Sequence, residues 1–369
     1  MKILLLGDYS NYHACLGRAL SQQGHEVTVA SDGGGWMDTS RTLSLGRPFK
    51  GKAGGLCLFT KMLLDQRLKG FDIVSLINPS FVKLRPARLK TIFDRLKRKN
   101  GYVFLGSVGT DKAVMDFLTS PDCTLRYSEY FSSPGNIYQP NKEVLEKDCL
   151  WQRDEIGEFC EYVYDNVDGV TTALYEYHLA MERRFPSDLL AYAGIPIELP
   201  EKTDREEKRT GKINLFLGRH SARKKFKGTD RLEKAALRVV SELPDLCTFS
   251  LVEDQPYSVY LDKLNGADIV LDQLYSYSPA TNALLAMADG KAVVSGGEPE
   301  FYDFIGEKDL KPIINAIPDD EALYITIYDA VQNFALTRKT AQAGREFVAR
   351  HNDSAIVARR CLDFWTSKM

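Results

Sequence analysis

Short apolar runs alternate with longer amphipathic stretches through the first hundred residues of the chain. The run Ile3–Leu6 leads into a turn at Gly7, Asp8 and Tyr9, and a stretch with helical spacing follows. Short runs of this kind fit strands that are buried on both faces, as in a parallel sheet. The pattern predicts an α/β domain with strands at 2–6, 26–30, 72–77 and 102–105 and helices at 11–23, 56–68 and 86–99.

The same alternation starts afresh after a polar segment. Residues 200–209 carry charges of both signs and no apolar face, which is typical of a domain boundary. A chain of 369 residues is also too long for one ordinary core. We therefore expect two Rossmann-like, doubly wound α/β domains, at 1–200 and 201–345, and a helical tail at 346–369. The strands predicted for the second domain are 213–217, 248–252, 269–271 and 291–295.

The stretch from 266 to 300 contains the first candidate ligand site. Ser278 and Pro279 fit the N-cap and first residue of a mostly apolar helix, and Gly290 fits its C-terminal cap. In an open α/β sheet, the loop before such a helix lies at the carboxyl ends of the strands, where ligands bind. A helix N-terminus there offers N–H groups and a positive dipole end to an anion. The sequence therefore predicts a phosphate site.

A basic loop after the predicted strand 213–217 is the second candidate. Five of the nine residues from 219 to 227 are Arg or Lys. A charge run is usually a solvated helix face, but this one lies between a strand end and a helix start. Arg contacts phosphate in a bidentate manner and Lys acts as a point charge, so we favour a diphosphate ligand. Nucleic acid is the competing anion, but no basic and aromatic stripe extends the loop along a groove.

Two loops of the first half also follow predicted strands. The dinucleotide fingerprint needs three spaced glycines in the turn at 7–9, and Gly7 is nearly alone there, so a dehydrogenase is the weaker interpretation. The loop at 106–111 is rich in Gly, Ser and Thr, and it fits a ligand loop or a helix N-cap, two compatible roles. The residues of interest are Gly7, Asp8, Tyr9, Gly109, Thr110 and Asp111.

Composition narrows the functional classes. Lys and Arg number 48 against 50 Asp and Glu, a formal net charge of −2 that gives no general argument for nucleic-acid binding. The seven Cys form no CxxC pair, which suggests reduced thiols in the cytosol. The five His are dispersed without metal-ligand spacing, so no metal site is expected. The first apolar run is too short for a signal peptide or a membrane span.

The helix predicted at 86–99 is strongly basic. Such a helix could lie on anionic lipid. The favoured interpretation is that its charges form the solvated outer face of a helix that covers a sheet, because charge runs commonly do no more than this.

Three segments resemble the GT-B-fold glycosyltransferases, most closely the retaining group that uses nucleotide sugars (glycosyltransferase families 1 and 4). Residues 1–31 are similar to the family's first strand, helix and "GHEV" second strand. Residues 214–236, NLFLGRHSARKKFKGTDRLEKAA, are similar to its Gly-Arg … Lys-Gly segment, and residues 286–300, AMADGKAVVSGGEPE, to its "EAMA-G-PVV…GG-PE" block. The resemblance implies two Rossmann-like domains facing across a cleft, with C-terminal helices that can cross back to the first domain.

The resemblance also implies roles for residues of the basic loop. In the family, an Arg and a Lys of this loop hold the donor diphosphate, and they match Arg219 and Lys227, which precedes Gly228. The spacing is longer here than usual, so Arg223 is an alternative partner of Lys227.

The chain departs from the family at two positions. The family commonly has two Glu eight positions apart that contact the sugar and the ribose, and these positions are Tyr277 and Leu285 here. Asp111 is the candidate for a polar catalytic residue facing the acceptor. The remaining candidates for binding the donor sugar and nucleotide are Ser278, Thr281, Asn282, Glu298 and Glu300.

The implied reaction is transfer of a hexosyl group, with retention, from a UDP- or GDP-linked sugar to an acceptor hydroxyl. Fixed cations and a helix N-terminus can stabilise the leaving diphosphate without a metal or another cofactor. The expected acceptor is a glycan, a lipid-linked molecule or a small molecule, in surface glycan or polysaccharide synthesis, and no nucleic acid is expected. The expected location is the cytoplasm, with peripheral contact to the inner face of the membrane left open.

Two alternatives from other classes remain. One is a catalytically impaired GT-B-like protein that binds a sugar nucleotide or acts as a regulator, which the missing Glu pair suggests. The other is an NAD-dependent oxidoreductase or epimerase built on the first half.

Overall fold

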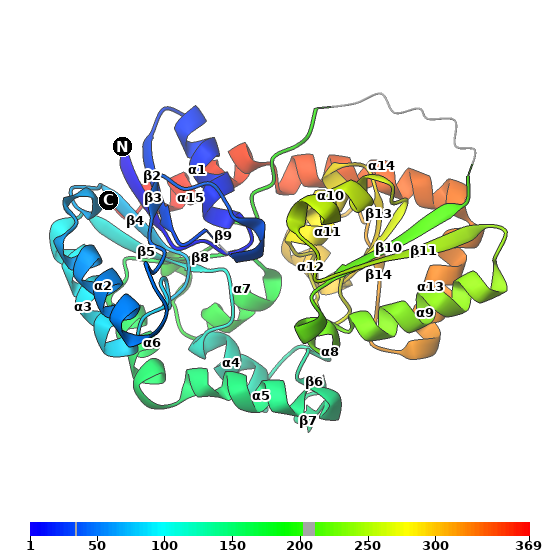
Figure 1. The fold of residues 1–369 in the computed structure, drawn as a ribbon, viewed down its shortest axis with the longest axis horizontal. Coiled ribbons are helices and arrows are strands. Elements are labelled where there is room, and N and C mark those ends of the chain that lie inside the picture. Colours follow the sequence, from blue (N-terminus) through cyan, green and yellow to red (C-terminus); the bar gives the residue numbers. More distant parts are fainter. Residues whose placement is uncertain (34, 202–210) are drawn as a thin grey trace. The chain divides into compact units, whose positions relative to one another are not determined.

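The structure is a computed structural model that describes residues 1–33, 35–201 and 211–369 (Figure 1). The chain folds into two compact units. Unit 1 comprises residues 1–119, 146–196 and 354–369, and unit 2 comprises residues 120–145 and 197–353. Most of the predicted boundary segment, 200–209, lies outside the described residues.

Unit 1 is built on a seven-stranded sheet in the order β3-β2-β1-β4-β5-β8-β9, and all neighbouring strands are parallel. The order runs outward from β1 in both directions, so right-handed crossovers place helices on both faces of the sheet. The strands are β1 (Lys2–Leu6), β2 (Glu26–Ser31), β3 (Leu43–Ser44), β4 (Ile73–Leu76), β5 (Tyr102–Ser107), β8 (Val170–Thr172) and β9 (Leu190–Tyr192). The helices are α1 (Tyr12–Gln22), α2 (Gly51–Leu64), α3 (Pro86–Lys99), α4 (Lys112–Thr119), α6 (Asp154–Asn166), α7 (Tyr175–Glu182) and α15 (Ser354–Thr366).

The last helix of the chain packs in the first unit. Trp365 of α15 is fully buried, and its ring centroid lies 5.9 Å from that of Phe104 on β5. Gln23, at the end of α1, donates a hydrogen bond to the carbonyl of Ala355 at 3.0 Å. The prediction that a C-terminal helix crosses back to the first domain is therefore confirmed, although the segment that returns begins at residue 354.

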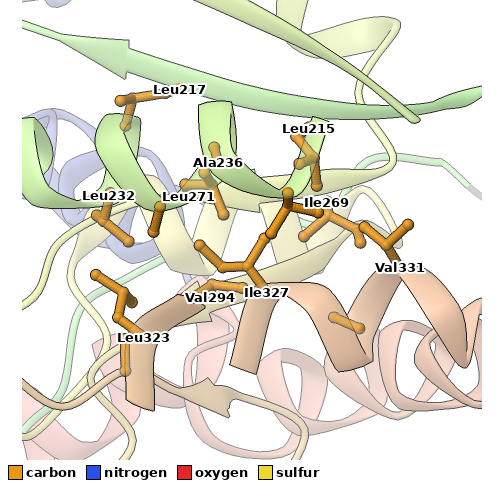
Figure 2. Close-up of a cluster of buried hydrophobic side chains, with 14 of the residues drawn as sticks. Leu215, Leu217, Leu232, Ala236, Ile269, Leu271, Val294, Leu323, Ile327 and Val331 are labelled. Carbon is orange, nitrogen blue, oxygen red and sulfur yellow. The ribbon is translucent and has the colours of Figure 1, made fainter. Parts of the chain in front are cut away.

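Unit 2 contains a five-stranded parallel sheet in the order β11-β10-β12-β13-β14. Leu215, Ile269 and Val294 are completely buried between this sheet and α9 and α13, and Figure 2 shows them in one cluster with Ala236 of α9 and Ile327 of α13. The strands are β10 (Ile213–Arg219), β11 (Cys247–Glu253), β12 (Ile269–Leu271), β13 (Ala292–Ser295) and β14 (Ile314–Asn315). The helices are α8 (Lys224–Lys227), α9 (Thr229–Glu242), α10 (Tyr257–Asn265), α11 (Thr281–Ala288), α12 (Pro299–Phe304), α13 (Asp320–Gln332) and α14 (Phe334–His351).

Residues 120–145 correct the predicted domain division, which placed them in the first domain. They form a small antiparallel hairpin, β6 (Phe131–Ser133) and β7 (Asn136–Ile137), ahead of α5 (Lys142–Asp148). The segment belongs to unit 2 because its aromatic side chains pack there. The ring of Tyr130 lies 5.7 Å from that of Phe226, and the ring of Tyr138 lies 5.5 Å from that of Tyr275.

Two helices begin at other positions than the sequence predicts. Helix α2 begins at Gly51 instead of Leu56, although glycines are poor helix formers. A Cβ at Gly54 would lie 1.8 Å from the carbonyl oxygen of Phe49, so close packing requires a glycine there. Helix α11 begins at Thr281 instead of near Ser278, because the backbone of Ala280 is extended. Among the described residues, no helix is both long and apolar enough to cross a membrane.

Candidate functional site

Three loops of unit 2 meet at the carboxyl-terminal edge of its sheet. They follow β10, β12 and β13, which are neighbours in the sheet. These loops are the basic loop 219–228, the loop 272–280 and the loop 296–298. Parallel strands end at the same edge, so the candidates predicted from separate parts of the sequence lie on adjacent loops.

Arg219 at the end of β10 is held by two carboxylates of its own unit. Its Nη1 lies 2.6 Å from Glu233, and its Nε lies 2.6 Å from Glu253. Only 7% of its side chain is exposed. The two carboxylates therefore neutralise the positive charge of the guanidinium group. Arg219 is for this reason less able to bind a phosphate than the sequence pattern suggests.

Lys227 is the last cation of the basic loop and is partly buried. Burial lowers the pKa of its ammonium group, the nearby Asp272 carboxylate raises it, and Arg223 lowers it. The carbonyl of Lys227 accepts a hydrogen bond from the N–H of Leu274 at 3.0 Å, which fixes the loop against the segment after β12. The positive charge of Arg223 acts on Lys227, so the two cations contribute to one positive region of the loop.

Gly228 allows this close approach. Its φ is +68°, a left-handed conformation that L side chains rarely adopt. A Cβ at this position would lie 2.7 Å from the Cβ of Leu274. Gly228 therefore allows the backbone of the basic loop to turn and to pack closely against Leu274 beside the candidate phosphate site.

Asp272 connects the loops beneath the site. Its carboxylate, 3% exposed as a residue, accepts hydrogen bonds from Nδ2 of Asn282 at 2.8 Å and from Oγ of Ser295 at 3.0 Å. The hydroxyl of Tyr260 donates to Oδ1 of Asn282. Asn282, predicted to contact the sugar, is thus part of a buried network around Asp272, the carboxylate that also acts on the charge of Lys227.

The first turn of α11 has the properties expected of an anion site. Thr281 is its first residue, and its N-cap residue, Ala280, makes no side-chain cap. Ser278, predicted as the cap, is 1% exposed in the preceding loop. The N–H groups of a first turn, together with the positive end of the helix dipole, favour a negative ligand.

Glu298 has a different environment from the one expected of a ribose ligand. It is 2% exposed, and both of its carboxylate oxygens accept hydrogen bonds, from Tyr127 and Asn315 on Oε1 and from Arg126 on Oε2. Glu300 is half-exposed and lies 3.2 Å from the same Arg126.

Tyr277 occupies one position where the family has Glu. Its hydroxyl accepts a hydrogen bond from the backbone N–H of Arg126 at 2.5 Å, and its ring lies 5.1 Å from that of Tyr127. Segment 120–145 thus holds the Glu298 and Tyr277 side chains in place.

The sequence interpretation missed three residues of this site. Arg126 and Tyr127 lie in a segment without periodicity, so no signal pointed to them. Asp272 had a signal, since it directly follows the apolar strand at 269–271. An acid at the carboxyl end of a buried strand is a common ligand or positioning group.

The turn after β1 is the corresponding region of unit 1. Gly7 has φ +82°, and a Cβ there would lie 2.4 Å from Ile77. The carboxylate of Asp8, 2% exposed, accepts hydrogen bonds from the N–H of His13 at 2.8 Å and the hydroxyl of Thr39 at 2.6 Å. Burial lowers the pKa of His13 to about 4, against the effect of Asp8, so the imidazole is neutral at physiological pH.

A pocket of about 180 Å³ opens beside this turn in unit 1. The hydroxyl of Tyr9 at its wall donates to the carbonyl of Ser80 at 3.2 Å, and Lys83 pairs with Asp32 at 2.7 Å. The mixture of apolar, acidic and basic walls can accommodate a small polar molecule. The other lining residues are Asp8, Gly35, Leu45, Arg47, Leu58, Phe81 and Val82.

Asp111 lies in the interior of unit 1. Its side chain has no exposed surface, and Oδ1 accepts the N–H of Val114 at 3.1 Å as a cap of α4. Burial raises the pKa of Asp111 to about 7. The carbonyls of Gly109 and Thr110 both accept hydrogen bonds from Nδ2 of Asn78 at 3.4 Å. Asp111 thus caps helix α4, as one of the two interpretations predicts. Its side chain has no solvent-exposed surface through which it could contact an acceptor.

No family model matches the sequence, and no curated protein matches it. Solved structures do match it. Sucrose-phosphate synthase from Thermosynechococcus elongatus is 16% identical, with a TM-score of 0.64 over 100% of this chain and 98% of its own. HepE from Anabaena, solved in complex with UDP and glucose, is 13% identical, with a TM-score of 0.58 over 100% of both chains. WaaG, a glycosyltransferase involved in lipopolysaccharide biosynthesis, is 11% identical, with a TM-score of 0.56 over 98% of this chain and 99% of its own.

These similarities extend over the whole chain, and at such low identity they concern the fold. Both units carry the doubly wound parallel sheet that the sequence predicts. The chain therefore has the two Rossmann-like domains of the GT-B glycosyltransferase fold, as expected from its three resembling segments.

Proposed function

We propose that this protein is a glycosyltransferase that moves a sugar from a nucleoside diphosphate sugar to an acceptor hydroxyl. The observation that supports it most is the set of charges around Lys227: Asp272 and Arg223 both act on its ammonium group, and Asp272 also accepts a hydrogen bond from Asn282 in the first turn of α11. Two cations and a helix N-terminus match the charge that develops on a leaving diphosphate. Arg219 has a smaller part in this proposal because Glu233 and Glu253 balance its charge.

The proposed reaction retains the configuration of a transferred hexose and requires no metal or other cofactor. In this scheme, Lys227 and Arg223 stabilise the diphosphate while the acceptor hydroxyl attacks from the same side of the sugar. The proposed acceptor is a glycan, a lipid-linked molecule or a small molecule in surface glycan synthesis. The pocket beside Asp8 and Tyr9 in unit 1 is the proposed place for its hydroxyl-bearing end. The proposed location is the cytoplasm.

A ligand-binding screen tests the donor. Thermal stability is measured with UDP, GDP, UDP- and GDP-linked sugars and NAD(H). We expect a stabilising shift with one nucleotide family, because a ligand that binds only the folded state raises the melting temperature. Lys227→Ala should lower the affinity at least about tenfold, in line with the loss of a charge-assisted contact. Lys339→Ala is the matched control, since Lys339 is exposed on α14.

An assay of donor turnover distinguishes a glycosyltransferase from a catalytically impaired binding protein and from an oxidoreductase or epimerase. Transfer or slow hydrolysis of the donor, abolished by Lys227→Ala, supports the transferase. Binding without any turnover across a panel of acceptors would favour the impaired or regulatory protein that Tyr277 and Leu285 suggest. Stabilisation by NAD(H) alone would overturn the proposal in favour of an oxidoreductase or epimerase.

A further inference from the structure

Helix α2 of unit 1 is apolar on two opposite faces. Its inner face buries Leu58 and Met62, which are 2% and 0% exposed. On its outer face Leu56 is 52% exposed and Leu64 is 68% exposed. The two exposed leucines lie eight residues apart, which places them on the same side of a helix. A helix that is apolar on both sides is normally covered on both sides.

The rest of the outer face continues this apolar strip. Cys57 and Thr60, between the two leucines, and Ala53, one turn before Leu56, are exposed on the same side, and none of them carries a charge. Phe49, just before the helix, is 55% exposed. Exposed large apolar side chains that cluster in this way usually mark an interaction surface.

Basic residues border this strip on both sides. Helical spacing places Lys52 along one edge and Lys61 along the other, and both are exposed. Lys50 follows Phe49 directly and is also exposed. From residue 41 to residue 64 the chain has five basic residues and no acidic one, although its overall formal charge is −2. The partner of this surface is therefore expected to be negatively charged.

The neighbouring helix α3 extends the positive charge. Arg88 of α3 lies over the ring of Phe59 on α2, 5.4 Å from its centroid. Residues 83–99 contain eight basic residues and one acidic residue. The apolar residues Leu89, Ile92, Phe93 and Leu96 of α3 are buried, which confirms that α3 is a sheet-covering helix with a charged outer face.

We propose that the outer face of α2 docks on an anionic lipid bilayer. In this arrangement Phe49, Leu56 and Leu64 enter the interfacial region, and the bordering lysines reach the lipid phosphates along their extended stems. A bilayer fits better than a folded partner because it presents an extended negative surface to both edges of the strip at once. The proposal concerns a surface outside both candidate sites, and it does not depend on the proposed activity.

Vesicle cosedimentation tests the proposal with the whole chain. The protein is mixed with vesicles of pure phosphatidylcholine and with vesicles of equimolar phosphatidylcholine and phosphatidylglycerol. We expect binding to the anionic vesicles, weaker binding at high salt and little binding to the neutral ones. Lys50→Gln and Lys52→Gln should each weaken the binding about fivefold. The double variant Leu56→Gln/Leu64→Gln should weaken it at least about tenfold.

The matched control is Leu336→Gln, because Leu336 is 65% exposed on α14 of unit 2. Its binding should equal that of the unmodified protein. Circular dichroism melting curves show whether each variant is folded. Absence of binding to anionic vesicles, equal binding to neutral vesicles, or normal binding by the folded double leucine variant would each overturn the proposal.

Discussion

Arg126 and Glu298 are 172 residues apart in the chain and form an ion pair within unit 2. Glu298 is almost completely buried, whereas more than half of the Arg126 side chain is exposed. Tyr127 donates a second hydrogen bond to the same carboxylate. The pair therefore connects segment 120–145 to the loop that precedes α12.

A double-mutant cycle measures this connection. Arg126→Ala should lower the free energy of unfolding of unit 2 by about 2 kcal/mol, because it leaves a buried carboxylate with one partner fewer. In a Glu298→Gln background the same change should have a much smaller effect. Chemical denaturation followed by tyrosine and tryptophan fluorescence gives the four values. Arg238→Ala, at an exposed ion pair with Glu321, is the control and should hardly move the midpoint. Equal effects of Arg126→Ala in both backgrounds would show that the ion pair between Arg126 and Glu298 does not contribute to stability.

Nucleotide binding should depend on the protonation of Lys227. Because burial lowers the pKa of Lys227, the ammonium loses its proton at a lower pH than an ordinary lysine, and affinity should fall as the pH rises through that value. Asp272 raises this pKa, so Asp272→Asn should move the loss of affinity to lower pH. Isothermal titration of the nucleotide from the screen against pH tests both expectations. Lys227→Arg should remove the dependence, and a pH profile unchanged by Asp272→Asn would argue against the assignment.

Asp111 should make unit 1 less stable as the pH rises. Its pKa in the folded state, about 7, lies above its unfolded value of about 3.9, so between these values the folded state binds more protons. Stability therefore falls as the pH rises from about 4 to about 7. Asp111→Asn keeps an oxygen for the N–H of Val114, and at pH 8 it should be more stable than the unmodified protein by about 4 kcal/mol.

Denaturation at several pH values measures this difference. The gain from Asp111→Asn should shrink toward zero near pH 4. His13, whose pKa is lowered to about 4, shifts stability in the opposite direction, but it is present in both proteins and cancels in the comparison. A gain that stays constant with pH would show that the carboxyl group does not titrate in this range.

Gly228 should tolerate no side chain. Gly228→Ala combines a left-handed backbone with a Cβ placed 2.7 Å from Leu274, and we expect a loss of about 2 to 4 kcal/mol in the free energy of unfolding. Gly290→Ala is the matched control, since Gly290 has φ +76° and nothing within 4 Å of the added Cβ. It should cost only about 1 kcal/mol. Similar losses for the two variants would mean that contact with Leu274 is unimportant.

The sequence by itself predicts the two sheets and the loops at their carboxyl ends. Buried parallel strands are short apolar runs, and Ile3–Leu6 and Ile269–Leu271 are recognisable without any knowledge of their neighbours. The chemistry of a loop at a strand end is local too. For that reason the cations around Lys227 and the helix after Ser278 could be predicted to lie at the carboxyl-terminal edge of the sheet, although the exact start of α11 could not.

The tertiary structure alone decides which charges remain available and where an irregular segment packs. Arg219 is balanced by Glu233 and Glu253, and both lie more than ten residues away along the chain. Segment 120–145 has no periodicity, and its aromatic rings pack on residues about a hundred or more positions later. Burial and ion pairing depend on groups that meet only when the chain has folded, so no local pattern reports them.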